Sequence, residues 1–380
     1  MGWKLSNVKP LGWIIILAVI GSIYWFGIKP HLGALPAIPG IKLPSFPGGS
    51  TSSSANGPDI VVLTTKTKQA WMQKEVDAFN AQSTGGKASL DLIESRQSMQ
   101  AILNGKVQPA VWSPSSPVWI YRLADIYPQG RIDTNSASAY KDLFKSPLVF
   151  LVNKSKLGKL QPILTGPHPF DHIRQLNDRG AGIRFGYADP INASSGMLTM
   201  TLLLNEYDDL HGGMDPVKAA QSSGFSGWLG DVNKELVRSD ISGSTALEQA
   251  FENDPSSRDF ITAYEGVGLL AAADNPSIAV VYPNPTANAE QSAVIVDGPW
   301  LSSDQLQTAN AFMQFISSPQ ALADGVQYDF RPDGPDGSVT LQEKLPSSTQ
   351  SQYRLSYTSV ELPPYDALND AAATWHTLVH

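Results

Sequence analysis

The stretch FGYADPINASSGMLTMTLLL, residues 185–204, contains the local pattern on which the whole chain is built. A short apolar run predicts a strand, which Asp189 and Pro190 bring to an end. Small and hydroxyl-bearing residues follow, and the next apolar run has the spacing of a helix. A helix start leaves backbone N–H groups without partners, so serines there can cap the helix or help to hold a ligand. We therefore take this junction as a candidate binding wall, with ordinary capping as the alternative.

The same succession of strand, loop and helix recurs from residue 59 onward. Strands are predicted at 59–65, 88–94, 110–113, 146–154 and 182–189. Helices are predicted at 68–82, 98–105, 194–206, 245–252 and 303–317. Alternating strands and helices predict an α/β fold, with parallel sheets covered by helices on both faces.

Hydroxyl and amide side chains recur where four successive predicted strands end. In α/β sheets, ligands bind at the carboxyl ends of the strands, where loops lead into helices. Each of these residues could by itself be a helix cap, but their repetition at four junctions favours a ligand site. The candidates are Thr64, Thr65 and Thr67; Ser95 and Ser98; Ser113, Ser115 and Ser116; and Asn192, Ser194, Ser195 and Gly196.

Several stretches in this order resemble bacterial extracellular solute-binding proteins of the two-lobed type II class, in the molybdate- and sulfate-type cluster. The stretch 102–120 is similar to the segment that delivers serines to the cleft, and SPLVFLVNK to the strand that crosses into the second lobe. The stretch 182–204 resembles the second lobe's cleft wall. FITAYEGVGLLAA, 260–272, resembles the strand that brings a tyrosine, here Tyr264, to the ligand, and 278–332 the return strand, second crossover and closing helix.

The resemblance implies a type II periplasmic-binding-protein fold with a central cleft. Lobe one is expected at 58–146 and 293–335, lobe two at 147–292, and an additional C-terminal extension at 336–380. The lobes would close like a hinge on a small polar or anionic solute, an oxyanion being favoured, for delivery to the membrane subunits of an ABC-type importer. An envelope signalling partner is the other possible recipient.

The subgroup is often linked to von Willebrand type A domains, whose metal site has the pattern Asp-x-Ser-x-Ser found in SDISGST, 239–245. The preceding NKELVR is too polar for the strand that such a site needs, so no metal is predicted. We interpret the segment as a loop whose Ser244 and Thr245 cap the next helix and reach the cleft.

Other side chains near the candidate site have two interpretations each. Lys66 and Lys68 could compensate the charge of an anion or simply be solvated. Trp112 and Trp119 could be core residues or stack on a planar ligand. Glu265 would repel a dianion if it faced the ligand, but residues that alternate along a strand point to opposite faces, so it can face away from Tyr264.

The N-terminal residues predict a membrane attachment. Residues 1–10 form a short arm, and the uncharged run 11–28 is long enough to cross a bilayer. Residues 29–57 have the composition of a Pro/Gly/Ser linker. A single-pass anchor with the globular part outside the cytoplasm is expected, and a cleaved signal peptide is the alternative.

The composition excludes several classes of function. The chain has no cysteine, so disulfide scaffolds and thiolate sites are excluded. All 35 acidic but only 23 of the 27 basic residues fall within 58–380, giving this part a net charge near −12 that disfavours nucleic acid as a partner. Catalytic motifs are not recognised, so neither an enzyme nor a cofactor is predicted. The second hypothesis is an anchored scaffold or sensor with a degenerate cleft, in which 365–380 is a docking helix.

Overall fold

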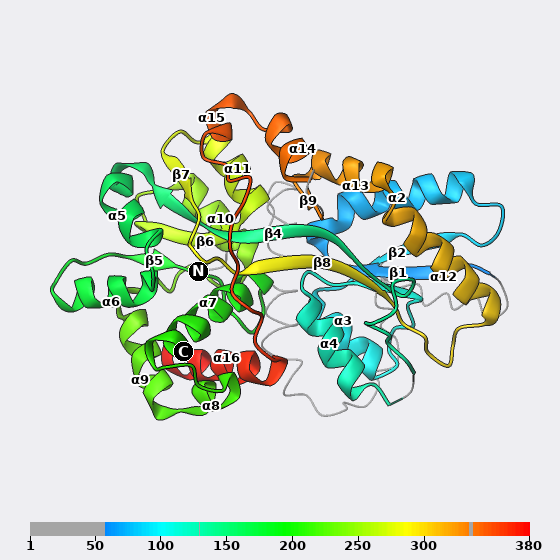
Figure 1. Cartoon of the computed structure of the whole chain (residues 1–380), viewed down its shortest axis with the longest axis horizontal. Helices are drawn as coiled ribbons and strands as arrows, with labels where there is room; N and C mark the ends of the chain where they lie inside the picture. The colour runs from blue at the N-terminus through cyan, green and yellow to red at the C-terminus, as the bar shows by residue number, and fades with distance from the viewer. Residues whose placement is uncertain (1–57, 129, 334–336) are drawn as a thin grey trace, which may run out of the picture. The chain divides into compact units, whose positions relative to one another are not determined.

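One long strand organises the fold in the computed structural model, which describes residues 58–128, 130–333 and 337–380. The first half of β4 (Tyr140–Asn153) pairs antiparallel with β8 (Asn288–Ile295) and β9 (Arg331–Pro332). Its second half pairs antiparallel with β6 (Phe260–Tyr264) and β7 (Ile278–Val281). β4 therefore belongs to two half-sheets, and we call the parts of the chain built around them lobe one and lobe two (Figure 1).

Lobe one contains a parallel core of three strands. β1 (Ile60–Thr64) lies between β2 (Ala88–Leu92) and β3 (Val111–Ser113), and β3 joins β8 in antiparallel register. The apolar side chains of β1 and β3 are buried between helices, as expected for a parallel sheet. The helices are η4 (Lys66–Lys68), α2 (Gln69–Gln82), α3 (Ser95–Leu103), α4 (Pro117–Ile126), α12 (Ser303–Ile316), α13 (Pro319–Gly325) and η7 (Val326–Tyr328).

Lobe two has its own aromatic core. β5 (Phe185–Gly186) runs parallel to β6, and the rings of Phe185 and Phe260 stack with centroids 5.3 Å apart. Phe150 of β4 meets Phe260 edge-on. The surrounding helices are η5 (Lys154–Lys156), α5 (Leu157–Leu164), α6 (Pro169–Asp178), α7 (Ser194–Leu210), α8 (Pro216–Gln221), α9 (Ser223–Val232), η6 (Asn233–Glu235), α10 (Ser244–Asn253) and α11 (Glu265–Asp274).

The C-terminal extension folds onto the rest of the chain. It comprises α14 (Gly337–Lys344), α15 (Ser347–Gln350), an irregular segment and α16 (Tyr365–Val379). α16 packs against α7, α8 and α9 of lobe two and against α4 of lobe one. The apolar face that a docking helix would offer to a partner is thus covered by the chain itself.

The predicted elements occur in the predicted order, with three differences in the sheet. The strand expected at 146–154 begins at Tyr140, and the one expected at 182–189 is reduced to Phe185–Gly186. The sheet is also mixed and not purely parallel, because the crossing strands β4 and β8 run antiparallel to each other and β8 runs antiparallel to β3. Pairing between segments some 150 residues apart has no signature in local periodicity.

The expected N-terminal arm 1–10, membrane span 11–28 and linker 29–57 lie outside the described residues. Of the helices that the structure does describe, none combines the length and apolarity that a bilayer crossing requires.

Candidate functional site

Helices of both lobes begin at the hydroxyl-rich junctions. Ser95 and Ser194 are the first residues of α3 and α7, and Ser244 is the first residue of α10. Ser116 is the N-cap of α4 and accepts a hydrogen bond from the backbone N–H of Val118. Because each helix start carries a partial positive charge, their meeting favours a negatively charged or electron-rich group.

A row of hydroxyl groups crosses from lobe one to lobe two. The hydroxyl oxygens of Ser95 and Ser115 are 2.8 Å apart, and the backbone N–H of Ser115 donates to Ser95 Oγ at 3.0 Å. Ser115 Oγ lies 2.9 Å from Ser194 Oγ of lobe two. The structure therefore brings serines from two lobes, 79 positions apart in the chain, into direct contact.

A second pair of hydroxyl groups lies within lobe two, at the next residue of α7. Ser195 Oγ lies 2.6 Å from Ser244 Oγ. Tyr264 ends β6, and burial raises the pKa of its hydroxyl, an effect that the nearby Ser194 hydroxyl opposes. We call Ser95, Ser115, Ser194, Ser195, Ser244 and Tyr264 the interlobe hydroxyl cluster.

Several buried polar atoms around this cluster have no hydrogen-bond partner among the described residues. They are Tyr264 Oη of the cluster itself, Gln291 Oε1 and Glu248 Oε1 near it, and Thr65 Oγ1 directly after β1. Buried polar groups in proteins are nearly always paired, and an unpaired one costs about 1–3 kcal/mol. The polar atoms of a bound solute would remove this cost.

Lys68 brings a buried cation to the lobe-one side. Its side chain is fully buried, and Nζ donates to the backbone oxygen of Pro114 at 2.5 Å, next to Ser115. Burial lowers the pKa of Lys68 well below its ordinary value, and among the described residues no carboxylate counteracts this. Lys66, by contrast, is exposed.

Glu248 is the acidic group of the site. It lies one helical turn after Ser244 on α10, and burial raises the pKa of its carboxyl to about 7. Its charge and that of Glu94 in lobe one both act on the Tyr264 hydroxyl. Near neutral pH the carboxyl can thus be protonated or charged.

Other predicted site residues lie outside the cluster, where they either make structural hydrogen bonds or are exposed. Ser98 Oγ accepts from the indole N–H of Trp112 at 3.0 Å, and Ser113 donates to the backbone oxygen of Ser292. Asn192, Thr67 and Thr245 are exposed, outside the cluster.

Two glycines lie at the starts of α7 and α10. A Cβ on Gly196 would lie 2.2 Å from the backbone oxygen of Ala188, so this glycine lets α7 start directly against the segment that follows β5. The N-cap of α10 is Gly243, without a side-chain cap hydrogen bond. The prediction that Ser244 and Thr245 cap this helix was therefore wrong, since both lie inside its first turn.

The two tryptophans and Glu265 have structural roles. Trp112 and Trp119 are buried in an apolar cluster built mainly from lobe-one residues, which supports the core interpretation over stacking on a ligand. Glu265 faces away from the cluster, as expected, and pairs with Arg331 while accepting a hydrogen bond from Tyr282 at 2.7 Å. Burial raises the pKa of the Glu265 carboxyl, and Arg331 opposes this shift.

Sequence analysis missed Gln291 and Glu248 as site residues. Gln291 lies in β8 and donates from Nε2 to the backbone oxygen of Ser115 at 3.3 Å. A glutamine in the half-polar strand β8 and a glutamate four residues after Ser244 are ordinary residues for a strand and a helix, so neither is a specific signal.

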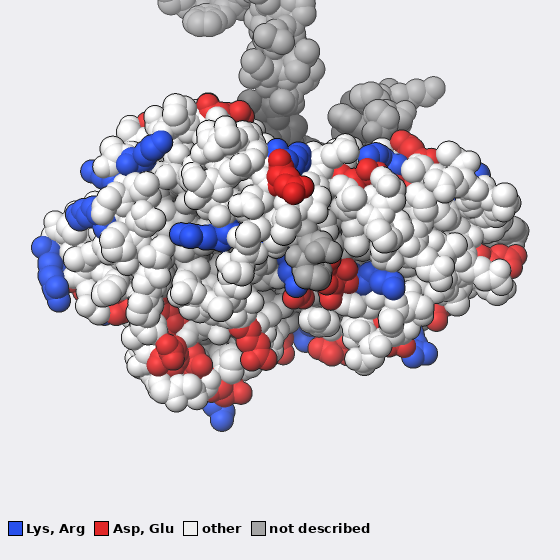
Figure 2. All heavy atoms as spheres, turned by 45° about the horizontal axis from the view of Figure 1, so that its top comes forward, with Lys and Arg blue, Asp and Glu red and all other residues white. Residues whose placement is uncertain are grey.

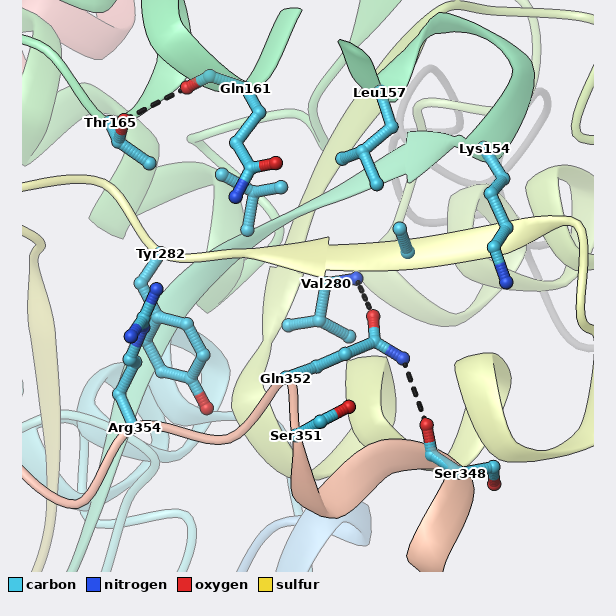
Figure 3. Close-up of a pocket in the computed structure, with 12 residues that line it drawn as sticks. Lys154, Leu157, Gln161, Thr165, Val280, Tyr282, Ser348, Ser351, Gln352 and Arg354 are labelled. Carbon is cyan, nitrogen blue, oxygen red and sulfur yellow. Dashed lines mark hydrogen bonds between the residues drawn. The ribbon is translucent and has the colours of Figure 1, made fainter.

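Two open cavities lie elsewhere, in lobe two. One of about 300 Å³ is bounded by α5, β7 and the residues after α15, where Gln352 accepts from the backbone N–H of Val280 (Figure 3). The other, of about 360 Å³, lies beside η5 and Asp259. Neither is lined by a residue of the interlobe hydroxyl cluster.

Figure 2 shows how charge is distributed over one face of the molecule. On the face shown in Figure 2, basic side chains are scattered among acidic ones and most of the surface is uncharged.

Solved structures of solute-binding proteins share this fold. The sulfate-binding protein SubI from Mycobacterium tuberculosis H37Rv is 16% identical with a TM-score of 0.55, over 82% of this chain and 95% of that one. The Trichodesmium protein IdiA (FutA), solved with iron and citrate, is 15% identical with a TM-score of 0.57, over 84% and 99%. The ferric binding protein from Campylobacter jejuni is 12% identical with a TM-score of 0.59, over 84% and 99%. At these identities the likeness shows the fold alone.

Comparison of sequences gives a family. No curated protein sequence matches the chain significantly. A family model described as "Bacterial extracellular solute-binding protein" matches residues 60–330, which include the whole hydroxyl cluster and the sheet strands of both lobes except β9. This is a family of binding proteins and not of enzymes. The chain therefore belongs to the bacterial extracellular solute-binding protein family.

Proposed function

We propose that this protein captures a small oxyanion between its lobes and delivers it to an ABC-type importer from the outer side of the cell membrane. The observation that carries the proposal is the contact between Ser115 and Ser194, which joins the starts of helices from two lobes through neutral hydroxyl donors. Neutral donors can satisfy a buried oxyanion without adding charge and select it by the number of hydrogen bonds.

The buried ammonium of Lys68 supports an anionic solute. A fully buried cation without a carboxylate partner is unfavourable, and an anion at the neighbouring serines would compensate it. The fold's likeness to a sulfate-binding protein is consistent with such a solute, although structures with iron are equally similar in fold.

The mechanism we propose is closure of the lobes about β4 and β8. In an open form the serines of α3 and α4 would hold the solute first, and α7 and α10 would then cover it. In the structure Ser115 and Ser194 join the two sides directly, which corresponds to a closed arrangement. The importer subunits would recognise this closed form, and the segment 11–28 would keep the protein at the membrane.

A scaffold or sensor with a degenerate cleft is the second candidate. It is favoured by the same contact, because hydroxyls that satisfy one another leave fewer groups for a solute. Under this function, loss of cluster hydroxyls would not affect activity, whereas deletion of 341–380 would abolish it.

Binding by the full-length chain tests the proposal. Thermal unfolding would be followed with sulfate, molybdate, phosphate, sugars, amino acids and metal ions. A solute at a hundred times its Kd should stabilise the fold by about 2.7 kcal/mol. Ser115→Ala and Tyr264→Phe should each reduce that stabilisation, whereas Ser303→Ala, at an exposed serine of α12, should not. Absence of any stabilising solute, with full activity of both cluster variants, would favour the scaffold.

A further inference from the structure

The chain carries a folded extension beyond the stretch that defines its family. The family match ends at residue 330, and α14, α15 and α16 follow it. Figure 1 shows the segment before α16 running past the crossing of β4 and β8. Tyr357 of this segment contacts Asn288, the first residue of β8, so the extension reaches one of the two strands about which the lobes would rotate.

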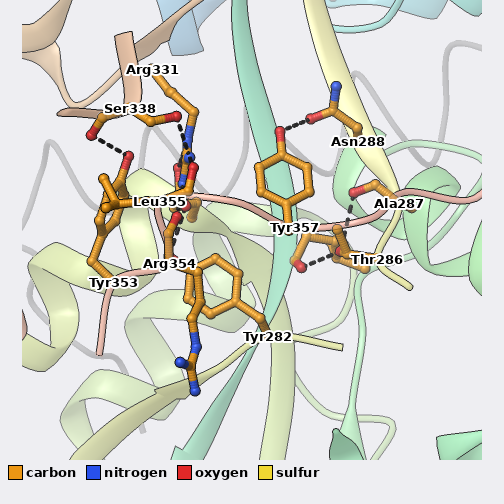
Figure 4. A network of polar contacts seen from close by, with 12 residues as sticks. Tyr282, Thr286, Ala287, Asn288, Arg331, Ser338, Tyr353, Arg354, Leu355 and Tyr357 are labelled. Atoms are coloured by element: carbon orange, nitrogen blue, oxygen red, sulfur yellow. Dashed lines mark hydrogen bonds and ion pairs between the residues drawn. The ribbon is translucent and has the colours of Figure 1, made fainter. Parts of the chain in front are cut away.

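A buried ion pair holds the extension near the region where β4 and β8 run from one lobe to the other (Figure 4). Arg331 lies on β9 beside the lobe-one half of β4, and its partner Glu265 begins α11 of lobe two. The Arg331 guanidinium also donates to the backbone oxygens of Arg354 at 2.9 Å and Leu355 at 3.1 Å. Lobe one, lobe two and the extension thus share one guanidinium.

The next residues of the extension pair with the chain that leads into β8. The hydroxyl of Tyr357 donates to Asn288 Oδ1 at 2.9 Å. The backbone N–H of Thr286 donates to the oxygen of Thr358 at 2.9 Å, and that of Val360 donates to the oxygen of Thr286 at 2.7 Å. These hydrogen bonds fix the segment before α16 against β8 and the residues that lead into it.

Most of the buried face of α16 belongs to lobe two. Arg238 donates to the backbone oxygen of Val379 at 2.9 Å, and Gln221 donates to Asp370 at 2.7 Å. This larger contact means that α16 would move together with lobe two. The α16 side chains that join the lobe-two core are Ala367, Ala371, Trp375 and Val379.

The first turns of α16 instead contact lobe one. Leu368 is fully buried in an apolar cluster with Val118 and Trp119 of α4, and Met197 of α7 joins the same cluster. This cluster therefore closes the seam between the lobes, on the two helices whose starts carry Ser116 and Ser194.

Aromatic and charged contacts extend the same seam. The ring of Tyr365 meets that of Trp119 edge-on with centroids 5.8 Å apart. Arg122 of α4 lies 4.9 Å above the Tyr365 ring and 3.4 Å from the Asp366 carboxylate. Opening of the lobes has to separate Tyr365 and Leu368 from α4, exposing apolar surface to water.

We propose that the first turns of α16 are an intramolecular latch that holds the lobes shut in the absence of solute. The latch is anchored in lobe two, closes on α4 of lobe one and is positioned by the contacts of the extension with β8. The resting protein is then closed, and solute enters only when α16 releases α4.

The distance between the lobes in the full-length protein tests the latch. The chain has no cysteine, so Gln100→Cys on α3 and Lys159→Cys on α5, both at exposed positions, give two unique sites for spin labels. Pulsed electron paramagnetic resonance without solute would compare this labelled parent with a variant carrying Tyr365→Ala and Leu368→Ala. Thr377→Ala, on the exposed side of the same helix, is the matched control.

We expect one short distance in the parent and in the control. The double variant should gain a longer distance, its ratio of open to closed molecules rising about tenfold or more because buried apolar contacts no longer oppose opening. If the double variant does not fold, Tyr365→Ser alone, at a half-buried ring, should shift the ratio in the same direction to a smaller extent. A parent that is already open, or folded latch variants with the distance distribution of the parent, would overturn the proposal.

Discussion

Replacing Lys68 with methionine should weaken solute binding without destabilising the fold. Methionine keeps an unbranched apolar side chain but removes the ammonium that donates to the backbone oxygen of Pro114. If this ammonium compensates a bound oxyanion, affinity should fall. The fold itself should not be destabilised, because burial disfavours the charged form of this amine in the empty site and methionine avoids that cost.

The burial of Lys68 sets the size of the expected loss. The side chain is 0% exposed, so solvent screens its interaction with a neighbouring anion very little. Removing one member of a buried, hydrogen-bonded charge pair costs about 2–5 kcal/mol, which corresponds to about a 30-fold or greater loss of affinity. Lys66→Met removes the same formal charge from an exposed neighbour and should change affinity by less than about threefold.

Titration calorimetry with the oxyanion that stabilises the chain most would measure this loss. Burial lowers the pKa of Lys68 in the empty site, and an adjacent anion should raise it again. Binding to the parent should therefore take up protons, seen as a heat that depends on the buffer, and binding to the variant should not. Equal affinities of parent and Lys68→Met, with no proton uptake by the parent, would refute the reasoning.

Denaturant unfolding of the same variant supplies the other half of the test. Because the pKa of Lys68 is lower in the folded state, the unfolded chain binds more protons above that lowered pKa and below the ordinary lysine pKa. The stability of the parent should gain a rising contribution as pH increases through this window. Lys68→Met should lack that contribution, and a fall in its stability at neutral pH would contradict the prediction.

Three further substitutions test the buried Glu248, the ion pair between Arg331 and Glu265, and the close contact of Gly196 with Ala188. Burial raises the pKa of Glu248 to about 7, so its contribution to stability is full below the pKa of an unfolded glutamate and disappears as pH rises through about 7. Oxyanion affinity should fall over the same upper range, because the charged carboxylate repels an anion. In a pH series, the affinity and the stability of Glu248→Gln should lack this dependence on pH. Arg331→Met leaves Glu265 buried without its partner and should destabilise the fold by about 3–5 kcal/mol in denaturant unfolding, with most of the loss recovered when Glu265→Gln is added. Gly196→Ala places a Cβ 2.2 Å from the backbone oxygen of Ala188, so we expect a lower melting temperature together with weaker solute binding, and unchanged values for both would show that α7 moves freely.

The sequence was sufficient for features that depend on neighbouring residues. Alternating apolar runs gave the order of strands and helices, and the hydroxyls after each strand marked the helix starts that meet at the cluster. These properties follow from residues close in the chain, since burial periodicity and capping act over a few positions. The resemblance to extracellular solute-binding proteins was confirmed by the family match.

Tertiary contacts decided which hydroxyls meet. Ser98 and Ser113 looked equivalent to Ser95 and Ser115 in the sequence, but their side chains hold Trp112 and β8 in place. Lys68 is buried although Lys66, two residues earlier, is exposed. A helical turn directs such neighbours to opposite sides, and only the packed surroundings determine which side is interior.

The contacts of the C-terminal extension also depend on the tertiary fold. Composition predicted a helix at 365–380 but not the surface that it covers. Leu368 joins α4 and α7 across some 250 and 170 positions of chain, and Arg331 joins two lobes through Glu265. The sequence by itself determined the helices, strands and hydroxyl-bearing junctions of this protein, because local steric and solvation preferences specify them. Only the tertiary structure decided which junctions converge and which residues cross the seam, because those contacts are selected by the joint packing of segments far apart in the chain.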